Sequence, residues 1–321
     1  NAQTEDGSMW VWIPRLAYRV NESNQTFDVV FLVGTTDTYY DDNGVLQTAK
    51  RCTSEDEAVD TSTGYTVHPA FTDETAINYR NGGWDKEITG IWVAKFEAGY
   101  ASGNNDAEVI ASSVNYTQTN AWVPDVESGE TTTNNGASKP ARNWLDGEYG
   151  GTTTAIKYPV FQPVTYTMNY INHNDAYNIA KALSSNGNPY GFNGAADSHL
   201  MKNSEWGAVA YLSKSKYGLG ATDITVNNIS LNNSTESVYA VTGCTSNSAT
   251  SGQRTTTIET IMGSDGTGTS GNTANGGVYT WDQKTGTTAS STGSIYGIYD
   301  LSGGAWERTT GYVANQNSNL S

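Results

Sequence analysis

The residue types best suited to covalent or metal chemistry are few and widely spaced in this chain. The two cysteines, Cys52 and Cys244, lie in opposite halves of the sequence, whereas cysteine metal sites normally use close pairs such as C-x-x-C. They could form one disulfide that closes a very long loop, or remain separate thiols that pack as small hydrophobic side chains. If the chain is secreted, we favour the disulfide.

The three histidines are His68, His173 and His199. None of them has a histidine or cysteine at zinc-ligand spacing, so the sequence offers no zinc site. Asp197, Ser198 and His199 are adjacent, but adjacency in sequence says little about the geometry of a catalytic triad, and no G-x-S-x-G element follows a strand. We therefore expect satisfied polar residues, with His68 in a loop, His173 at a helix start and His199 before a second helix.

Carboxylates could act as catalytic pairs or as metal ligands. Glycoside hydrolysis needs two of them about 5–10 Å apart, and Glu97 with Glu205 is a conceivable pair. Asp41, Asp42 and Asn43 could supply oxygen ligands for Ca²⁺. Their spacing fits no EF-hand loop, so we favour a solvated turn.

Aromatic side chains in polar stretches are the candidates for ligand binding. Trp122, Trp144, Tyr149 and Trp281 each stand among small polar residues and would offer flat apolar faces surrounded by amides and hydroxyls. Such surfaces suit sugars and protein partners alike. The alternative is that these rings fasten long loops to the body of the protein.

Composition narrows the classes of partner. The chain has 321 residues with 33 acidic and 17 basic side chains, a net charge of −16, and this charge repels nucleic acid and anionic lipid. No apolar run of 18 residues is present, and the first ten residues carry no secretion signal. Only 16% of residues are charged, whereas Gly (34) and Tyr (20) are abundant. This composition favours a loop-rich β structure and an extracellular or cell-surface location.

Hydrophobic patterns predict the elements that would position these residues. Alternation over 9–20 predicts a half-buried strand that Pro14 interrupts, and 27–33 predicts a second strand followed by an acidic turn over 37–44. The clearest strand is expected over 90–99, with Ile91, Val93 and Phe96 facing inward.

Two helices are expected, over 172–183 and 203–211, with Glu205 in the first turn of the second. The first helix is expected to have Asn172 or Asn174 as its cap and an apolar stripe of Ala176, Ile179, Ala180 and Leu183. The second is expected to have Asn203 or Ser204 as its cap and an apolar stripe of Trp206, Val209 and Ala210.

The remaining stretches resemble loop insertions on one domain that spans 1–321. Residues 101–151 and 218–293 are rich in polar and turn-forming residues, with strand candidates only at 238–241 and 278–281.

Four segments, in this order, resemble the formylglycine-generating-enzyme-like (sulfatase-modifying-factor) family. They are GIWVAKFE (90–97), the stretch from Pro163 to Tyr177, HLMKNSEW (199–206) and YGIYDLSGGAWE (296–307). The last two are similar to the family's Leu-Pro-Thr-Glu-x-Glu-Trp and Gly-Leu-Tyr-Asp-Met-x-Gly-Asn-x-Trp-Glu elements.

The resemblance implies an α+β, C-type-lectin-like fold, with two helices on a mixed or antiparallel β core. Relatives expected from it include surface and pilin-like proteins of gut Gram-positive bacteria. The family's oxidases need two cysteines beyond the Trp-Glu element, and none follows Glu307 here, so no oxidase activity is expected. A family Ca²⁺ site would match Glu307 with the carbonyls of Gly303 and Ala305, although Gly304 replaces the usual Asn.

The sequence therefore favours a non-catalytic extracellular protein that displays loops for ligand binding or adhesion, the ligand being a carbohydrate or a protein surface. One alternative is a pilin-like filament subunit whose identical neighbours complete its sheet, because an amino-terminal anchor and closing carboxy-terminal strands are expected to be missing from 1–321. Another alternative is an enzyme of unknown chemistry. No cofactor is expected apart from Ca²⁺.

Overall fold

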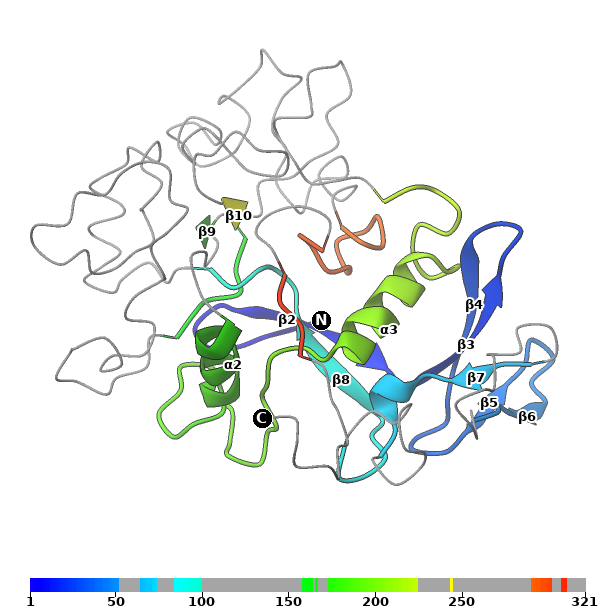
Figure 1. Ribbon diagram of the computed structural model, residues 1–321, viewed down its shortest axis with the longest axis horizontal. Coiled ribbons are helices and arrows are strands. Elements are labelled where there is room, and N and C mark those ends of the chain that lie inside the picture. The colour runs from blue at the N-terminus through cyan, green and yellow to red at the C-terminus, as the bar shows by residue number, and fades with distance from the viewer. Residues whose placement is uncertain are drawn as a thin grey trace, which may run out of the picture. The chain divides into compact units, whose positions relative to one another are not determined.

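The computed structural model describes residues 1–51, 64–73, 84–99, 158–163, 165–166, 173–224, 243–244, 290–301 and 307–310. Within these ranges the chain is a mixed α+β protein with small sheets and two α-helices (Figure 1).

The chain divides into two compact units that interleave along the sequence. Unit 1 contains Asn1–Val11, Ala94–Leu200 and Ile224–Arg308, and unit 2 contains Trp12–Val93, Met201–Asp223 and Thr309–Ser321. Each unit is built from segments that are distant in sequence. The single domain expected over 1–321 stays a prediction.

Proline divides the first predicted strand in two. β2 (Met9–Pro14) ends at Pro14, which has no backbone N–H to donate, and β3 (Leu16–Asn21) begins after Arg15. β3 pairs antiparallel with β4 (Thr26–Phe31) on one side and with β7 (Thr66–Val67) on the other.

The predicted half-buried alternation is wrong for the start of β3, where Leu16, Ala17 and Tyr18 are all buried. The reason is that both faces of this central strand are covered. Tyr18 packs against Tyr211, with ring centroids 4.8 Å apart, while Ala17 lies in a cluster with Leu32, Ala49 and Val67.

The predicted acidic turn over 37–44 is shorter than expected, because its first part is a strand. β5 (Thr38–Tyr40) pairs antiparallel with β6 (Leu46–Thr48), and the turn lies between them. The Asp41 carboxylate accepts hydrogen bonds from the backbone N–H groups of Asn43 and Val45, both at 2.9 Å, and from Gln47 at 3.0 Å. It organises its own loop, which agrees with the turn interpretation.

The strand predicted over 90–99 is confirmed as β8 (Gly90–Ala94), and Ile91, Val93 and Phe96 are buried as expected. β8 lies next to β2, which also pairs with β1 (Ala2–Gln3), giving the order β1-β2-β8.

Both predicted helices are present. α2 (His173–Ala182) buries Ile179, and Leu183 just beyond it is buried as well, while Ala176 and Ala180 are half-buried. The structure places Asn174 inside the helix, so it is not the cap.

α3 (Asn203–Ser213) begins at the predicted residue and ends two residues later than predicted. Its cap is Lys202, so the predicted caps Asn203 and Ser204 are wrong. Its most buried apolar residues are Ala208, Val209 and Leu212, whereas Trp206 and Ala210 are only half-buried. Of the three predicted positions, Val209 alone is buried, and Ala208 and Leu212 complete the buried apolar face.

The aromatic core of unit 1 collects around Trp10. Its ring lies 4.8 Å from that of Phe161 and 5.9 Å from that of Tyr190, and Leu183 completes the cluster. The sequence pattern did not reveal three short elements: the 3₁₀ turn η1 (Pro69–Phe71) and the parallel pair β9 (Thr165–Tyr166) and β10 (Gly243–Cys244). The strand candidates at 238–241 and 278–281, and the insertion over 101–151, lie outside the described residues.

Candidate functional site

Most of the ligand and metal candidates from the sequence lie outside the described residues. This applies to Trp122, Trp144, Tyr149, Trp281, Cys52, Gly303 and Ala305. Cys244 falls in β10, and its pairing with Cys52 stays a prediction. Glu307 is exposed, and among the described residues no group of three His, Cys, Asp or Glu side chains could hold a metal ion. The Ca²⁺ site also stays a prediction.

The histidines have local structural roles. His68 is buried and caps η1, where its Nδ1 accepts a hydrogen bond from the Ala70 N–H at 3.2 Å. Burial lowers the pKa of His68 to about 3, so its ring is neutral. His199 Nδ1 lies 2.9 Å from the backbone oxygen of Asp197, which belongs to a local turn. His173 is exposed at the start of α2.

Glu97 and Glu205, the conceivable carboxylate pair, belong to different units. Glu205 is buried and accepts a hydrogen bond from the backbone N–H of Lys202 at 2.8 Å. It satisfies one of the free N–H groups at the start of α3. This carboxylate therefore already has a structural role.

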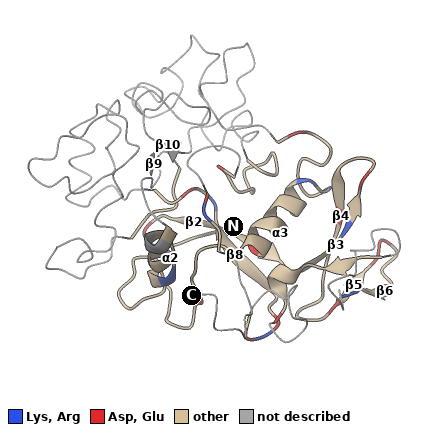
Figure 2. Ribbon diagram, viewed as in Figure 1, with Lys and Arg blue, Asp and Glu red and all other residues tan. Residues whose placement is uncertain are grey.

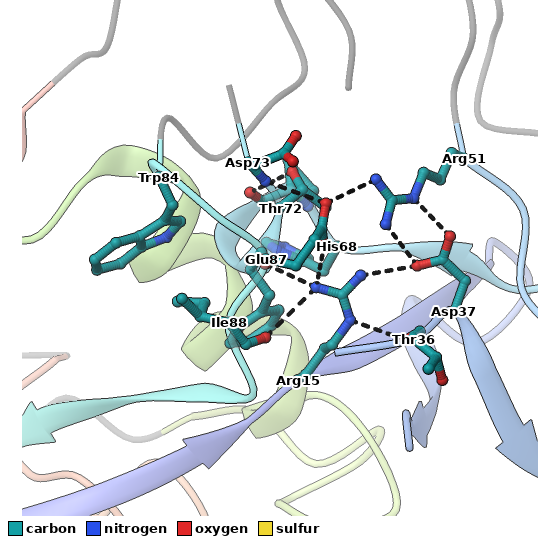
Figure 3. A network of polar contacts seen from close by, with 12 residues as sticks. Arg15, Thr36, Asp37, Arg51, His68, Thr72, Asp73, Trp84, Glu87 and Ile88 are labelled. Carbon is teal, nitrogen blue, oxygen red and sulfur yellow. Dashed lines mark hydrogen bonds and ion pairs between the residues drawn. The ribbon is translucent and has the colours of Figure 1, made fainter. Parts of the chain in front are cut away.

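Unit 2 contains a network of two arginines and two carboxylates that the sequence did not reveal (Figure 3). The side chain of Arg15 is fully buried, and its guanidinium lies 2.8 Å from Asp37 and 2.6 Å from Glu87. Arg51 pairs with the same two carboxylates, at 2.6 Å from Asp37 and 2.8 Å from Glu87. Each carboxylate thus joins both arginines.

Backbone carbonyls use the remaining donors of Arg15. Its Nε donates to Thr36 O at 3.0 Å and its Nη1 to Phe71 O at 2.7 Å. Burial raises the pKa of Asp37, but hydrogen bonds from Arg51 and Arg15 outweigh burial and leave that pKa lowered. The two guanidinium groups and the two carboxylates match in number, so we interpret the network as a structural anchor. Removal of one partner of the buried Arg15 would cost roughly 3–5 kcal/mol.

Another buried cation among the described residues is Lys95, which follows β8 and belongs to unit 1. Its side chain is 1% exposed, and its Nζ donates to Asn1 Oδ1 and to Gly297 O, each at 3.0 Å, and also to Ile295 O. Burial lowers the pKa of Lys95 to about 8. The three oxygens offset part of the cost of removing this ammonium from water.

Lys95 fastens a turn of unit 1 formed by residues 290–301, which we call the 290–301 turn. The backbone N–H of Tyr299 donates to Lys95 O at 2.8 Å, and the Tyr299 ring stacks on Phe96 with centroids 5.2 Å apart. Within the turn, Ser290 Oγ donates to Ser294 O at 2.7 Å and accepts from Ser294 N at 2.9 Å. The turn is therefore held both by its own side chains and by the body of the unit.

The 290–301 turn presents an exposed aromatic ring. The carbonyls of Ile295 and Gly297 bind Lys95, and the carbonyl of Tyr296 between them accepts from Asn1 Nδ2 at 3.4 Å. Three consecutive carbonyls are thus used by the body of the unit, while the Tyr296 residue is 68% exposed. It is the most exposed large hydrophobic residue in the described part of the chain, and Ile295 beside it is 37% exposed.

The arrangement combines an exposed aromatic ring with a buried amine. Lys95 is covered, so its amine cannot reach a substrate in solution. Tyr296 combines a large apolar ring with a hydroxyl, which suits an interface. A sequence signal for the site existed in retrospect: a lysine directly after an apolar strand, and a serine- and glycine-rich turn around a tyrosine.

Comparison of the chain with protein families, with curated proteins and with solved structures found no match. A search of the described residues also found no helix with the length and apolar character that crossing a membrane requires.

Proposed function

We propose that this chain is a non-catalytic binding module of a secreted or surface-displayed protein, built on a C-type-lectin-like α+β fold. The 290–301 turn is its described contact surface. The observation that carries the proposal is the exposure of Tyr296 on a turn whose backbone is already fixed by Lys95. Binding of a partner to this ring should cost little conformational entropy in the turn, because the turn has a defined conformation before binding.

Composition and resemblance support the rest of the proposal. The low content of charged residues and the abundance of Tyr, Gly and small polar residues suit a surface protein with long loops. The 290–301 turn also contains the first half of the segment that resembles the family's fourth element, and β8 leads into Lys95 within the first such segment. Lys95 of the first segment donates to Gly297 O of the fourth, and both residues belong to unit 1.

The test is binding to immobilised gastric mucin, collagen and fibrinogen, measured by interferometry for the unaltered chain and for Tyr296→Ala. We expect binding to at least one of these surfaces and a loss of affinity of about tenfold or more in the variant, since exposed tyrosines are frequent hot spots. Tyr217→Ala is the matched control, because Tyr217 is 43% exposed but lies in unit 2. Equal affinity of Tyr296→Ala and the unaltered chain would contradict the proposal.

A filament subunit is the second candidate, and the position of two strands favours it. In the described residues, β8 stands at one end of the sheet β1-β2-β8, and β4 stands at one end of the sheet β4-β3-β7. A strand at the end of a sheet can pair with a strand from another copy.

A further inference from the structure

A pair of tryptophans on neighbouring strands of unit 2 forms a second aromatic surface, separate from the 290–301 turn. Trp12 lies on β2 and Trp92 on β8, with ring centroids 5.2 Å apart and ring planes inclined at 57°. Two backbone hydrogen bonds flank the pair, from Arg15 N to Thr89 O and from Lys95 N to Met9 O. These two bonds set an antiparallel register between β2 and β8, in which Trp12 lies directly opposite Trp92.

Glycine fixes the position of the Trp12 indole. A Cβ atom at Gly90 would clash with Cζ2 of Trp12 and would lie 2.5 Å from the backbone oxygen of Ile13. The indole therefore lies across β8 in the space that Gly90 leaves. Because both rings stand on paired strands and one is held against the backbone, the surface exists before any ligand arrives.

The Trp92 ring faces away from the core. Its strand neighbours Ile91 and Val93 are buried, whereas Trp92 is 52% exposed, as the alternation of side chains along a strand requires. Trp12 is half-buried beside it. Half of a large indole thus stays in water, although a smaller or polar residue would satisfy the strand equally well.

We propose that the Trp12–Trp92 pair binds the apolar face of a neutral saccharide ring. The size of the surface favours a sugar over a protein partner. In the described part of unit 2, the other exposed large hydrophobic residues stand on β4, β5, β6 and the loops beside them and after α3. β2 and β8 therefore offer two rings there, whereas a stable protein interface uses about 20–30 residues on each side. One or two pyranose rings match a pair of indoles in area.

Charge selects a neutral sugar over an acidic one. Neither β2 nor β8 contains a charged residue, as Figure 2 shows, so these strands offer no cation to pair with a carboxylate or sulfate. The net charge of −16 repels anionic polymers in addition. Stacking of the C–H face of a neutral ring on indole requires no charge partner.

The experiment is affinity electrophoresis of the whole chain in gels that contain xylan, galactomannan, hydroxyethyl cellulose or, as an anionic comparison, polygalacturonate. We expect at least one neutral polymer to retard the unaltered chain and Trp92→Ala to weaken that affinity about tenfold. Trp92→Phe, which keeps a ring, should retain part of it, and Gly90→Ala, which displaces Trp12, should also weaken it. Tyr40→Ala removes another exposed ring of unit 2 and should change nothing.

The outcomes separate this inference from the proposed function, on which it does not depend. Retardation that survives in Tyr296→Ala but falls in Trp92→Ala supports the Trp12–Trp92 surface alone. The inference is overturned if no neutral polymer retards the chain, if only polygalacturonate does, or if Trp92→Ala runs like the unaltered chain in every gel.

Discussion

Single residues show how chemically promising side chains of this protein take structural roles. His68 is enclosed by the rings of Tyr18, Phe71 and Tyr211, with centroids 5.4, 6.1 and 5.1 Å away. One ring nitrogen caps η1, and burial lowers the pKa of the ring so that it stays neutral. The sequence showed a histidine before a proline, but no local pattern could indicate that Tyr18 of β3 and Tyr211 of α3 would pack against it.

The burial of His68 makes stability depend on pH. Its pKa falls from 6.5 to about 3 on folding, so between these values the unfolded chain binds a proton that the folded chain does not. The free energy of unfolding should therefore be highest above pH 6.5 and should decrease as the pH falls toward 3, by up to roughly 1.4 kcal/mol per pH unit from this residue. Urea unfolding at a series of pH values measures the slope.

Two variants test this assignment. His68→Asn keeps a capping oxygen but removes the titration, so its slope between pH 6 and 4 should be shallower, whatever its absolute stability. His173→Asn, at an exposed position, should keep the slope of the unaltered chain. The assignment fails if both variants and the unaltered chain give the same slope.

At the scale of elements, periodicity predicted the strands and helices well and their surroundings poorly. β8, α2 and α3 appear where the apolar pattern placed them, since an apolar stripe must face a core. The burial of Arg15 and Lys95 could not be predicted, because it depends on partners such as Glu87 and Gly297 that are remote in sequence. The 290–301 turn is recognisable only once those partners are in place.

The 290–301 turn depends on glycine at position 297. A Cβ there would clash with Thr292 Oγ1 and would lie 3.0 Å from Ser290 Oγ, whose hydrogen bonds to Ser294 hold the turn. Gly297→Ala should therefore reduce the free energy of unfolding by about 1–3 kcal/mol. Gly194→Ala is the control, because open space surrounds a Cβ at Gly194, and it should be neutral or slightly stabilising. Chemical denaturation of both variants decides the matter, and equal stability would contradict this account of the turn.

At the scale of the whole molecule, charge and strand edges act in opposite directions. A net charge of −16 makes copies of the chain repel one another, whereas terminal strands such as β4 and β8 could pair between copies. The acidic excess is visible in the sequence, whereas the strands that stand at the ends of the sheets are known only from the structure. Whether copies of the chain associate depends on how strongly salt screens this repulsion.

Electron microscopy of the purified chain at low and at physiological ionic strength addresses that conflict. A binding module should appear as discrete particles in both conditions, since repulsion dominates at low salt and no strand needs a neighbour. Salt at about 0.15 M reduces the range of the repulsion to roughly 8 Å, so a filament subunit should assemble there if strand edges drive association. Filaments that appear only with salt would favour the structural alternative, and Tyr296 and the Trp12–Trp92 pair would then be displayed many times along one polymer.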